Sequence, residues 1–203
     1  MDSKSIPDRL ELRVEIEDAS ISRSQLQGKT WVDDALRESL GKANVVIIPW
    51  ENFRELDTPV FPDGTADFFQ DMRDSAKPKL LPEIAVIDEQ YSEVALHADL
   101  VITPTLFVTS FIAPVVTKFV ADWLARRLLE RAKHSDVKFQ MYIEDENGKT
   151  RLISYEGPVI SFDSLVSSQL LQDSSLVPKS AINDGATQNN ALEEKENCEE
   201  SNE

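Results

Sequence analysis

Hydrophobic and charged residues alternate in two stretches of this chain, which predicts half-exposed β-strands there. Over 9–17 every second side chain is apolar and those between are charged. A period of two places one face of a strand on a core and the other in water. The alternation returns over 137–143, and Asn147-Gly148 followed by a second such run to Gly157 predicts a β-hairpin.

Continuous apolar runs and helical periodicity alternate through the first half of the chain. The apolar runs predict buried strands at 44–49, 83–88 and 98–102. Apolar residues at helical spacing predict helices over 31–42, with Thr30 as the N-cap, and over 65–76. The segments between them are predicted as loops at 18–30 and 50–63 and as a short helix or turn at 91–97. This order predicts parallel strand pairing through right-handed crossovers.

A long uncharged run occupies the middle of the chain. Leu100 to Thr117 carries no charge, and an amphipathic stretch over 118–133 follows it. A central strand followed by a buried half-helix fits this pattern. A membrane segment over 100–121 also fits, because about 20 apolar residues cross a bilayer as a helix. We expect a helix to begin near Thr105, with Pro114 either kinking it or marking its true start.

These elements predict an α/β fold with a small mixed sheet, parallel βαβ units, a long amphipathic helix and a C-terminal β-hairpin. One domain is expected over 1–171, divided into a βαβ part at 9–104 and a helix–hairpin–helix part at 105–171. A last helix is predicted over 161–171. Residues 172–203 are polar and acidic, and they are predicted to form a disordered tail.

The charge balance narrows the classes of partner. The formal net charge is −16, of which −6 lies in 172–203. Phosphate backbones are repelled by such a chain at long range, which argues against broad nucleic-acid binding. The one cysteine, Cys198, has no internal partner, and the first residues lack an apolar signal core, so a cytoplasmic location is expected. Membrane attachment is the alternative location.

No catalytic or cofactor-binding motif stands out. The two histidines, His97 and His134, have no metal-ligand spacing, and the six glycines are too scattered to form a phosphate-binding loop. The sequence therefore favours a protein without enzymatic activity, and it calls for no metal or cofactor.

Two candidate contact surfaces emerge, and protein–protein contact is the function that they favour. The irregular stretch 50–63 carries aromatic and basic residues typical of contact loops, namely Trp50, Phe53, Arg54 and Phe61. The same rings would equally serve to staple the loop to the core. The long helix carries a local excess of cations that would suit an acidic partner or anionic lipid, including Lys118, Arg126, Arg127 and Arg131. A sheet edge offered by the hairpin at 137–155 is a third candidate.

A small-molecule pocket is a further candidate. In open α/β sheets, ligands bind beyond the carboxyl ends of the strands. Trp50 and Arg54 follow one predicted strand and Asp88 follows the next, so these three residues would share an edge. The alternative hypotheses are thus a membrane-attached effector with 100–121 inserted, and an enzyme or nucleotide sensor with this pocket.

The segment 119–165 has an outline seen in one bacterial family. A Trp-Leu helix ending in arginines leads through a charged turn into a strand–Asn-Gly–strand hairpin. In this outline the segment resembles the effector-associated constant component family of bacterial conflict systems. The matching positions are Trp123, Leu124, Arg126, Arg127, Asp136, Val137, Gly148 and Lys149. Bulky Phe111, Ile112 and Val116 replace the small residues with which that family begins its helix. The resemblance implies an adaptor or regulator in bacterial defence, without an active site.

Overall fold

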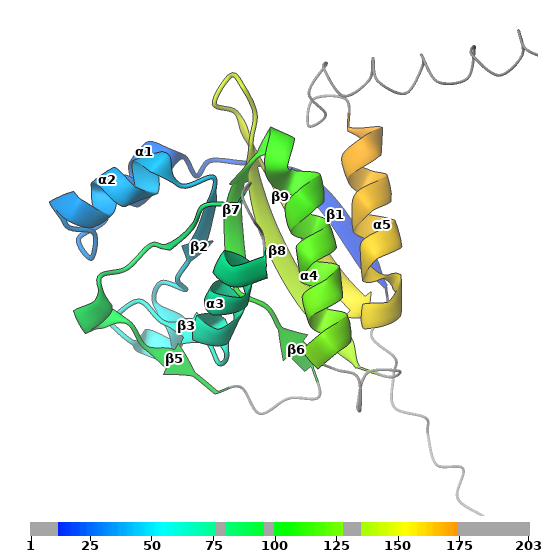
Figure 1. Cartoon of the computed structure of the whole chain (residues 1–203), viewed down its shortest axis with the longest axis horizontal. Coiled ribbons are helices and arrows are strands. Elements are labelled where there is room, and N and C mark those ends of the chain that lie inside the picture. The colour runs from blue at the N-terminus through cyan, green and yellow to red at the C-terminus, as the bar shows by residue number, and fades with distance from the viewer. Residues whose placement is uncertain (1–11, 76–79, 96–99, 128–134, 174–203) are drawn as a thin grey trace, which may run out of the picture.

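A mixed sheet of seven strands forms the centre of the computed structural model, which describes residues 12–75, 80–95, 100–127 and 135–173 (Figure 1). The strands are β1 (Arg13–Ala19), β2 (Val45–Ile48), β4 (Pro82–Ile84), β6 (Leu100–Ile102), β7 (Thr105–Thr109), β8 (Asp136–Glu144) and β9 (Thr150–Pro158). Their order is β1-β9-β8-β7-β2-β4, with β6 also beside β8. The pairs β2–β4, β6–β8 and β7–β8 are parallel, and β1–β9, β8–β9 and β2–β7 are antiparallel. The α/β class, the mixed sheet and the C-terminal hairpin are thereby confirmed.

Helices cover both faces of the sheet. The helices α3 (Thr65–Ser75), α4 (Ala113–Arg127) and α5 (Val159–Gln172) pack on one face, and α1 (Arg23–Gln27) and α2 (Asp34–Lys42) pack on the other. Consecutive residues of β2 point into different layers: Val45 and Ile47 meet α3 and α4, whereas Val46 and Ile48 meet α1 and α2. Burial on both faces explains why β2 is a continuous apolar run.

The cover of the second face is incomplete. The cluster around α1 and α2 takes in residues of β2 and β7 and one partly buried residue of β8, but none of β1 or β9. No described helix packs there on the outward-facing side chains of β8, β9 and β1, which are largely polar. This open half of the sheet is where Lys138, Gln140 and Glu156 lie.

Strand β7 corrects the expectation of a helix from Thr105. Leu106, Phe107 and Val108 are fully buried, with the first and third facing α4 and the second facing α2. Pro104 has no backbone N–H to donate to a helix or a ladder, and the β-branched and aromatic residues after it suit a buried strand. Helix α4 begins at Ala113, so Pro114 marks the true helix start, in the first turn where proline is tolerated.

The uncharged run over 100–117 is therefore built from β6, β7, a short 3₁₀ turn (η3, Ser110–Ile112) and the start of α4. None of the helices in the described part of the chain has the length and apolar character needed to cross a bilayer.

Helix positions in the first third differ from the sequence prediction in two places. Helix α1 lies within the predicted loop 18–30, and Ser22 and Gln25 form a capping box at its start. Helix α2 begins at Asp34 rather than near Trp31, because the Asp33 carboxylate accepts the backbone N–H of Leu36 at 2.7 Å and acts as the N-cap in place of Thr30.

The segment 82–95 also differs from the prediction. Strand β4 (Pro82–Ile84) covers only the first two residues of the predicted strand 83–88, and a 3₁₀ turn (η2, Asp88–Gln90) begins at its last residue. The segment 91–97, predicted as a short helix or turn, contains a short strand instead, β5 (Glu93–Val94), which pairs in parallel with β3 (Phe61–Pro62). Of the expected parallel pairs, β2–β4 is observed, whereas β1 lies at the far edge beside β9.

Several predictions fall outside the described residues. These concern residues 9–11 of the first strand, the two histidines, the last turns of the 118–133 helix with Arg131, and the tail beyond Asp173.

Gly64 provides a test of the packing between α3 and α4. Its φ is +83°, and a Cβ there would lie 2.4 Å from Nη2 of Arg127. Gly148 has a similar φ of +76°, but a Cβ added to it would have no neighbouring atom within 4 Å. We expect Gly148→Ala to lower the free energy of unfolding by about 1 kcal/mol, because only the backbone is strained. Gly64→Ala should lower it by more, since Arg127 must also move. Urea unfolding of both variants measures the difference, and equal losses would contradict the packing.

Candidate functional site

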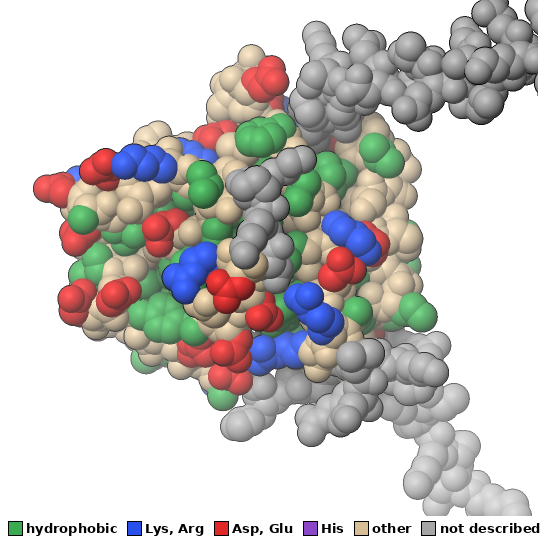
Figure 2. Space-filling model, in the orientation of Figure 1, with side chains coloured by type: hydrophobic (Ala, Val, Ile, Leu, Met, Phe, Trp, Pro, Cys, Tyr) green, Lys and Arg blue, Asp and Glu red, His purple; other side chains and the backbone are tan. Residues whose placement is uncertain are grey.

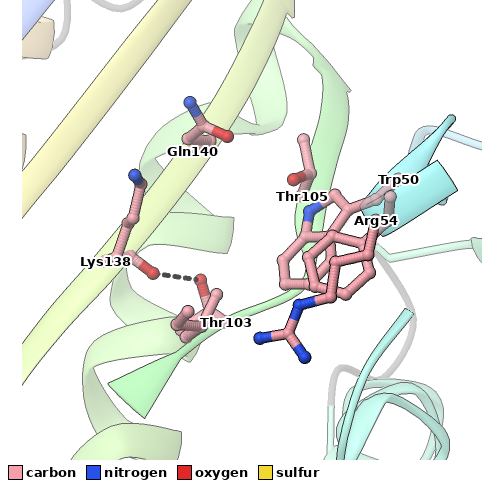
Figure 3. Close-up of a pocket in the computed structure, with 8 residues that line it drawn as sticks. Trp50, Arg54, Thr103, Thr105, Lys138 and Gln140 are labelled. Atoms are coloured by element: carbon pink, nitrogen blue, oxygen red, sulfur yellow. Dashed lines mark hydrogen bonds between the residues drawn. The ribbon is translucent and has the colours of Figure 1, made fainter. Parts of the chain in front are cut away.

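A recess of about 330 Å³ lies between the loop after β2 and the open half of the sheet (Figure 3). Trp50 and Arg54 stand on one side of it, and Lys138 and Gln140 rise from β8 on the other. The complete lining is Trp50, Phe53, Arg54, Ile102, Thr103, Thr105, Lys138 and Gln140.

The loop that carries Trp50, Phe53 and Arg54 is closed at its base. Trp50 and Val60 exchange two backbone hydrogen bonds, of 2.7 and 3.1 Å, which form an isolated antiparallel bridge. Pro49 and Val60 at this base are buried, whereas Asn52, Arg54 and Glu55 at the tip are exposed. We call residues 50–60 the Trp50 loop. Because its ends are fixed to the core, its tip is held beside the sheet.

The tip of the Trp50 loop has an unusual backbone. Asn52, Arg54 and Glu55 have φ values of 54°, 49° and 64°, in the left-handed region. Asparagine tolerates this conformation, but arginine and glutamate adopt it at a cost of about 1–2 kcal/mol each. Strain of this kind persists where the surrounding structure imposes it and is concentrated at functional sites. At this loop it accompanies the placement of Arg54 over the recess.

The strain at Glu55 can be measured by relieving it. Glu55→Gly should raise the free energy of unfolding by up to about 1 kcal/mol, because glycine has no penalty at φ 64°. Asp57→Gly is the matched control: Asp57 is exposed in the same loop and does not have a positive φ. The control should be destabilised by about 0.5–1 kcal/mol through added chain entropy. Thermal unfolding of both variants checks the opposite signs, and destabilisation by Glu55→Gly would refute the strain.

Aromatic packing orients Arg54. The rings of Trp50 and Phe53 have their centroids 5.2 Å apart at an angle of 32°, and Cζ of Arg54 lies 5.1 Å from the Phe53 centroid. A guanidinium over a ring face is held by the ring quadrupole, while the N–H groups in its plane stay available as donors. Among the described residues no carboxylate lies within 4 Å of Arg54, so its charge is uncompensated by an ion pair.

The floor of the recess is a break between two strands. Strands β6 and β7 both run parallel to β8, but Thr103-Pro104 interrupts them. Thr103 donates from its backbone N–H at 3.1 Å, and from its hydroxyl at 3.3 Å, to the backbone carbonyl of Lys138. The ladder is therefore held together across the break, and Ile102, Thr103 and Thr105 line the recess there.

Strand β8 supplies the second cation. Lys138 and Gln140 are two residues apart, which directs both side chains to the same face of the strand. Val137, Phe139 and Met141 between and beside them are buried against the helices of the other face. Nζ of Lys138 lies 3.8 Å from a carboxylate oxygen of Glu156 on β9, and both side chains are partly exposed, so this pair is weak.

The chemical character of the recess follows from its lining. Two cations, two hydroxyl groups, one amide and two aromatic rings face it, and no carboxylate does. This contrasts with the whole chain, whose net charge is −16. The lining residues include no histidine, cysteine or carboxylic acid that would serve as an acid, base or activated nucleophile. Such a lining suits the binding of an anion with an attached planar group.

The other residues of the predicted aromatic surface lie apart from the recess. Phe61 is fully buried and stacks on Tyr91 with centroids 5.1 Å apart, so it belongs to the core. Asp88 lines a separate depression beside Glu83, where burial, chiefly, and the charge of Asp88 raise the pKa of Glu83. The structure thus brings Trp50 and Arg54 together and places Asp88 elsewhere.

The cations in the described part of the long helix lie close to carboxylate side chains. Lys118 lies 2.9 Å from Asp122 and 3.6 Å from Asp163, and its hydrogen bond to Asp122 raises its pKa. Arg127 packs over Trp123 at 5.0 Å from the ring centroid and lies 3.7 Å from Asp67.

Arg126 lines the same acidic depression as Arg127, beside Asp67 and Asp71 on α3. On the face that Figure 2 shows, basic and acidic side chains are interspersed. Lys118, Arg126 and Arg127 therefore do not form one basic surface, and Arg131 lies outside the described residues. The hairpin offers no free strand edge, because β8 pairs with β6 and β7 and β9 pairs with β1.

Sequence reasoning missed the contribution of the sheet to the recess. The outward alternate positions of the predicted strand 137–143 include Lys138 and Gln140, and Thr103-Pro104 is a visible interruption in an apolar run. Nothing in the order of residues, however, indicates that this interruption faces the Trp50 loop. The joint site depends on how β8 is paired.

Comparison with known proteins gave no match: no family model, curated protein sequence or solved structure is significantly similar to this chain.

Proposed function

We propose that this chain is a non-enzymatic accessory or regulatory protein that acts by binding, and that the recess under the Trp50 loop is its binding site for an anionic group. The observation that carries the proposal is the guanidinium of Arg54, which has no carboxylate partner among the described residues and shares a concave site with Lys138.

The charge arrangement supports this function. A planar guanidinium forms paired hydrogen bonds to phosphate or carboxylate oxygens, and charge-assisted bonds are about twice as strong as neutral ones. The hydroxyl of Thr105 and the amide of Gln140 add hydrogen-bond donors around the same space. The recess is lined by two cations in a chain whose net charge is −16, so it is a place where this acidic protein offers an anion favourable partners.

The biological setting that we propose follows from the sequence alone. The resemblance of 119–165 to the effector-associated constant component family makes bacterial defence the proposed process, and the cytoplasm the proposed location. In this setting the protein would regulate an effector through the occupancy of the recess.

Anion binding to the full chain tests the proposal. Inorganic pyrophosphate should raise the melting temperature of the protein in differential scanning fluorimetry, because a ligand that binds only the folded state stabilises it. Arg54→Gln and Lys138→Gln should each remove most of this shift. Lys149→Gln is the charge-matched control: Lys149 lies in the hairpin turn and pairs with Asp18 at 3.0 Å. No shift in the parent protein, or an equal shift in all four proteins, would overturn the proposal.

A further inference from the structure

We propose that the recess takes a nucleoside phosphate, with the base against Trp50 and Phe53 and the phosphate between Arg54 and Lys138. This inference rests on the proposed function, since it identifies the anion that the same site would bind.

The size of the recess limits the ligand. Pockets for small molecules occupy about 300–1,000 Å³, and at about 330 Å³ this one lies at the lower end. One ring system with one or two phosphate groups suits that volume better than a dinucleotide or a folded protein segment does.

The aromatic side of the recess suits a base. Trp50 and Phe53 are each half-buried and both line the recess, and Arg54 lies over one face of the Phe53 ring. Any of the nucleic-acid bases can stack on such a ring, because every base has a π face. Arg54 follows Phe53 directly, which places the phosphate-binding group one residue from the stacking surface.

The polar side of the recess suits a phosphate. The fork of Arg54 matches two phosphate oxygens, and Lys138 supplies a second, mobile positive charge from the opposite wall. Figure 3 shows these two side chains on either side of the space, with Thr103 and Thr105 nearby.

The surface next to the recess argues against longer polyanions. A second depression shares Lys138 and Gln140 with the recess and continues along the open sheet. Three carboxylates line it there, Glu15, Glu17 and Glu156, against one further cation, Arg13, which is paired with Glu15. A nucleic-acid strand or an acidic peptide that extended from Lys138 along the sheet would meet these carboxylates. A small anion that ends at Lys138 avoids them.

Replacing Glu156 should raise the affinity of the recess for a nucleotide. The Glu156 carboxylate lies 3.8 Å from Nζ of Lys138 and competes with a phosphate for that cation. In Glu156→Gln the competition and the nearby negative charge are both removed. We expect nucleotide binding to tighten about three- to tenfold, where tenfold corresponds to about 1.4 kcal/mol. A residue with a merely structural role would not increase affinity when it is replaced.

Isothermal titration calorimetry of the full chain tests the inference with separate probes: adenosine and uridine 5′-monophosphates and diphosphates, adenosine alone, and pyrophosphate alone. At least one nucleotide should bind about tenfold or more tightly than both adenosine and pyrophosphate. Arg54→Gln should weaken nucleotide binding about tenfold, and Lys149→Gln should leave it unchanged.

The aromatic variants separate the base from the phosphate. Trp50→Leu should weaken nucleotide binding more than pyrophosphate binding. Phe53→Leu also removes the ring on which Arg54 packs, so it should weaken both. The melting temperatures of the two variants report whether the loop still folds. If pyrophosphate binds but no nucleotide binds more tightly, this inference fails and the proposed function stands. If neither probe binds, both fail. A loss of nucleotide affinity in Glu156→Gln would also overturn the inference.

Discussion

Replacing Phe162 by alanine is expected to lower the free energy of unfolding by about 3–5 kcal/mol. The ring is fully buried between α5 and the sheet, and it meets two others edge to face: Phe139 at 5.0 Å and 81°, and Tyr155 at 5.3 Å and 89°. Removing it leaves a cavity whose rigid walls in β8 and β9 have little freedom to collapse. For a domain stabilised by about 5–15 kcal/mol, this is a large fraction of the total.

The same helix supplies the control for Phe162. Ile160 is 82 % exposed, so Ile160→Ala should change the free energy of unfolding by less than about 0.5 kcal/mol. Guanidinium unfolding followed by far-ultraviolet circular dichroism gives both values. A loss below about 1.5 kcal/mol for Phe162→Ala would show that α5 does not pack on the sheet as described.

Glu93→Gln is expected to destabilise the protein by about 1–2 kcal/mol at neutral pH, through the start of α3. The Glu93 carboxylate accepts the backbone N–H groups of Gly64 and Ala66, each at 2.8 Å, and the hydroxyl of Tyr91. Hydrogen bonds to a charged acceptor contribute about 1.5–3 kcal/mol, and partial exposure of the carboxylate reduces that value. The carboxylate also opposes the positive end of the α3 dipole, which glutamine cannot do.

The effect of Glu93 should depend on pH. Burial raises the pKa of Glu93, but the hydrogen bonds from Tyr91, Ala66 and Gly64 outweigh it, so the pKa lies below the ordinary 4.5. A carboxyl group with a lowered pKa stabilises the folded state fully above its unfolded value and loses that contribution as the pH falls through the folded value. The difference between the parent protein and Glu93→Gln should therefore be full at pH 7 and shrink below about pH 4.5.

Unfolding in urea between pH 3 and pH 7 measures this dependence. Glu89→Gln is the control, because Glu89 is exposed on the neighbouring turn and no hydrogen bond of its side chain is seen among the described residues. The control should stay within about 0.5 kcal/mol of the parent protein at pH 7. A constant difference between the Glu93 variant and the parent protein over the whole pH range would contradict the role of the charged carboxylate.

The elements with strong local signals were predictable from the sequence. Three features could be predicted from a few neighbouring residues: the alternation in β8, the Asn147-Gly148 turn and the apolar run of β2. All three are observed. The turn is fixed locally, because Asp145 accepts the backbone N–H groups of Asn147 and Lys149 and Gly148 takes a positive φ. Helix α1, in a segment predicted as a loop, also has a local signal in its capping box of Ser22 and Gln25.

The uncharged middle of the chain shows where local reasoning ends. Its composition suits a strand, a helix or a membrane segment equally, since all three need apolar residues. Only the sheet decides: β7 is inserted between β2 and β8, and both of its faces are covered. That insertion depends on contacts between residues 35 or more positions apart in the chain, which no local period encodes.

The amino-acid sequence by itself determined which segments have a buried face, where the hairpin turns, and that the protein carries no recognisable catalytic motif. The tertiary structure alone decided the recess. Arg54 and Lys138 line one recess because the Trp50–Val60 bridge fixes one wall while strand pairing across the Thr103-Pro104 break fixes the other. Backbone hydrogen bonds between strands far apart in the chain hold the two walls in place, and the register of those strands cannot be seen in the local pattern of residues.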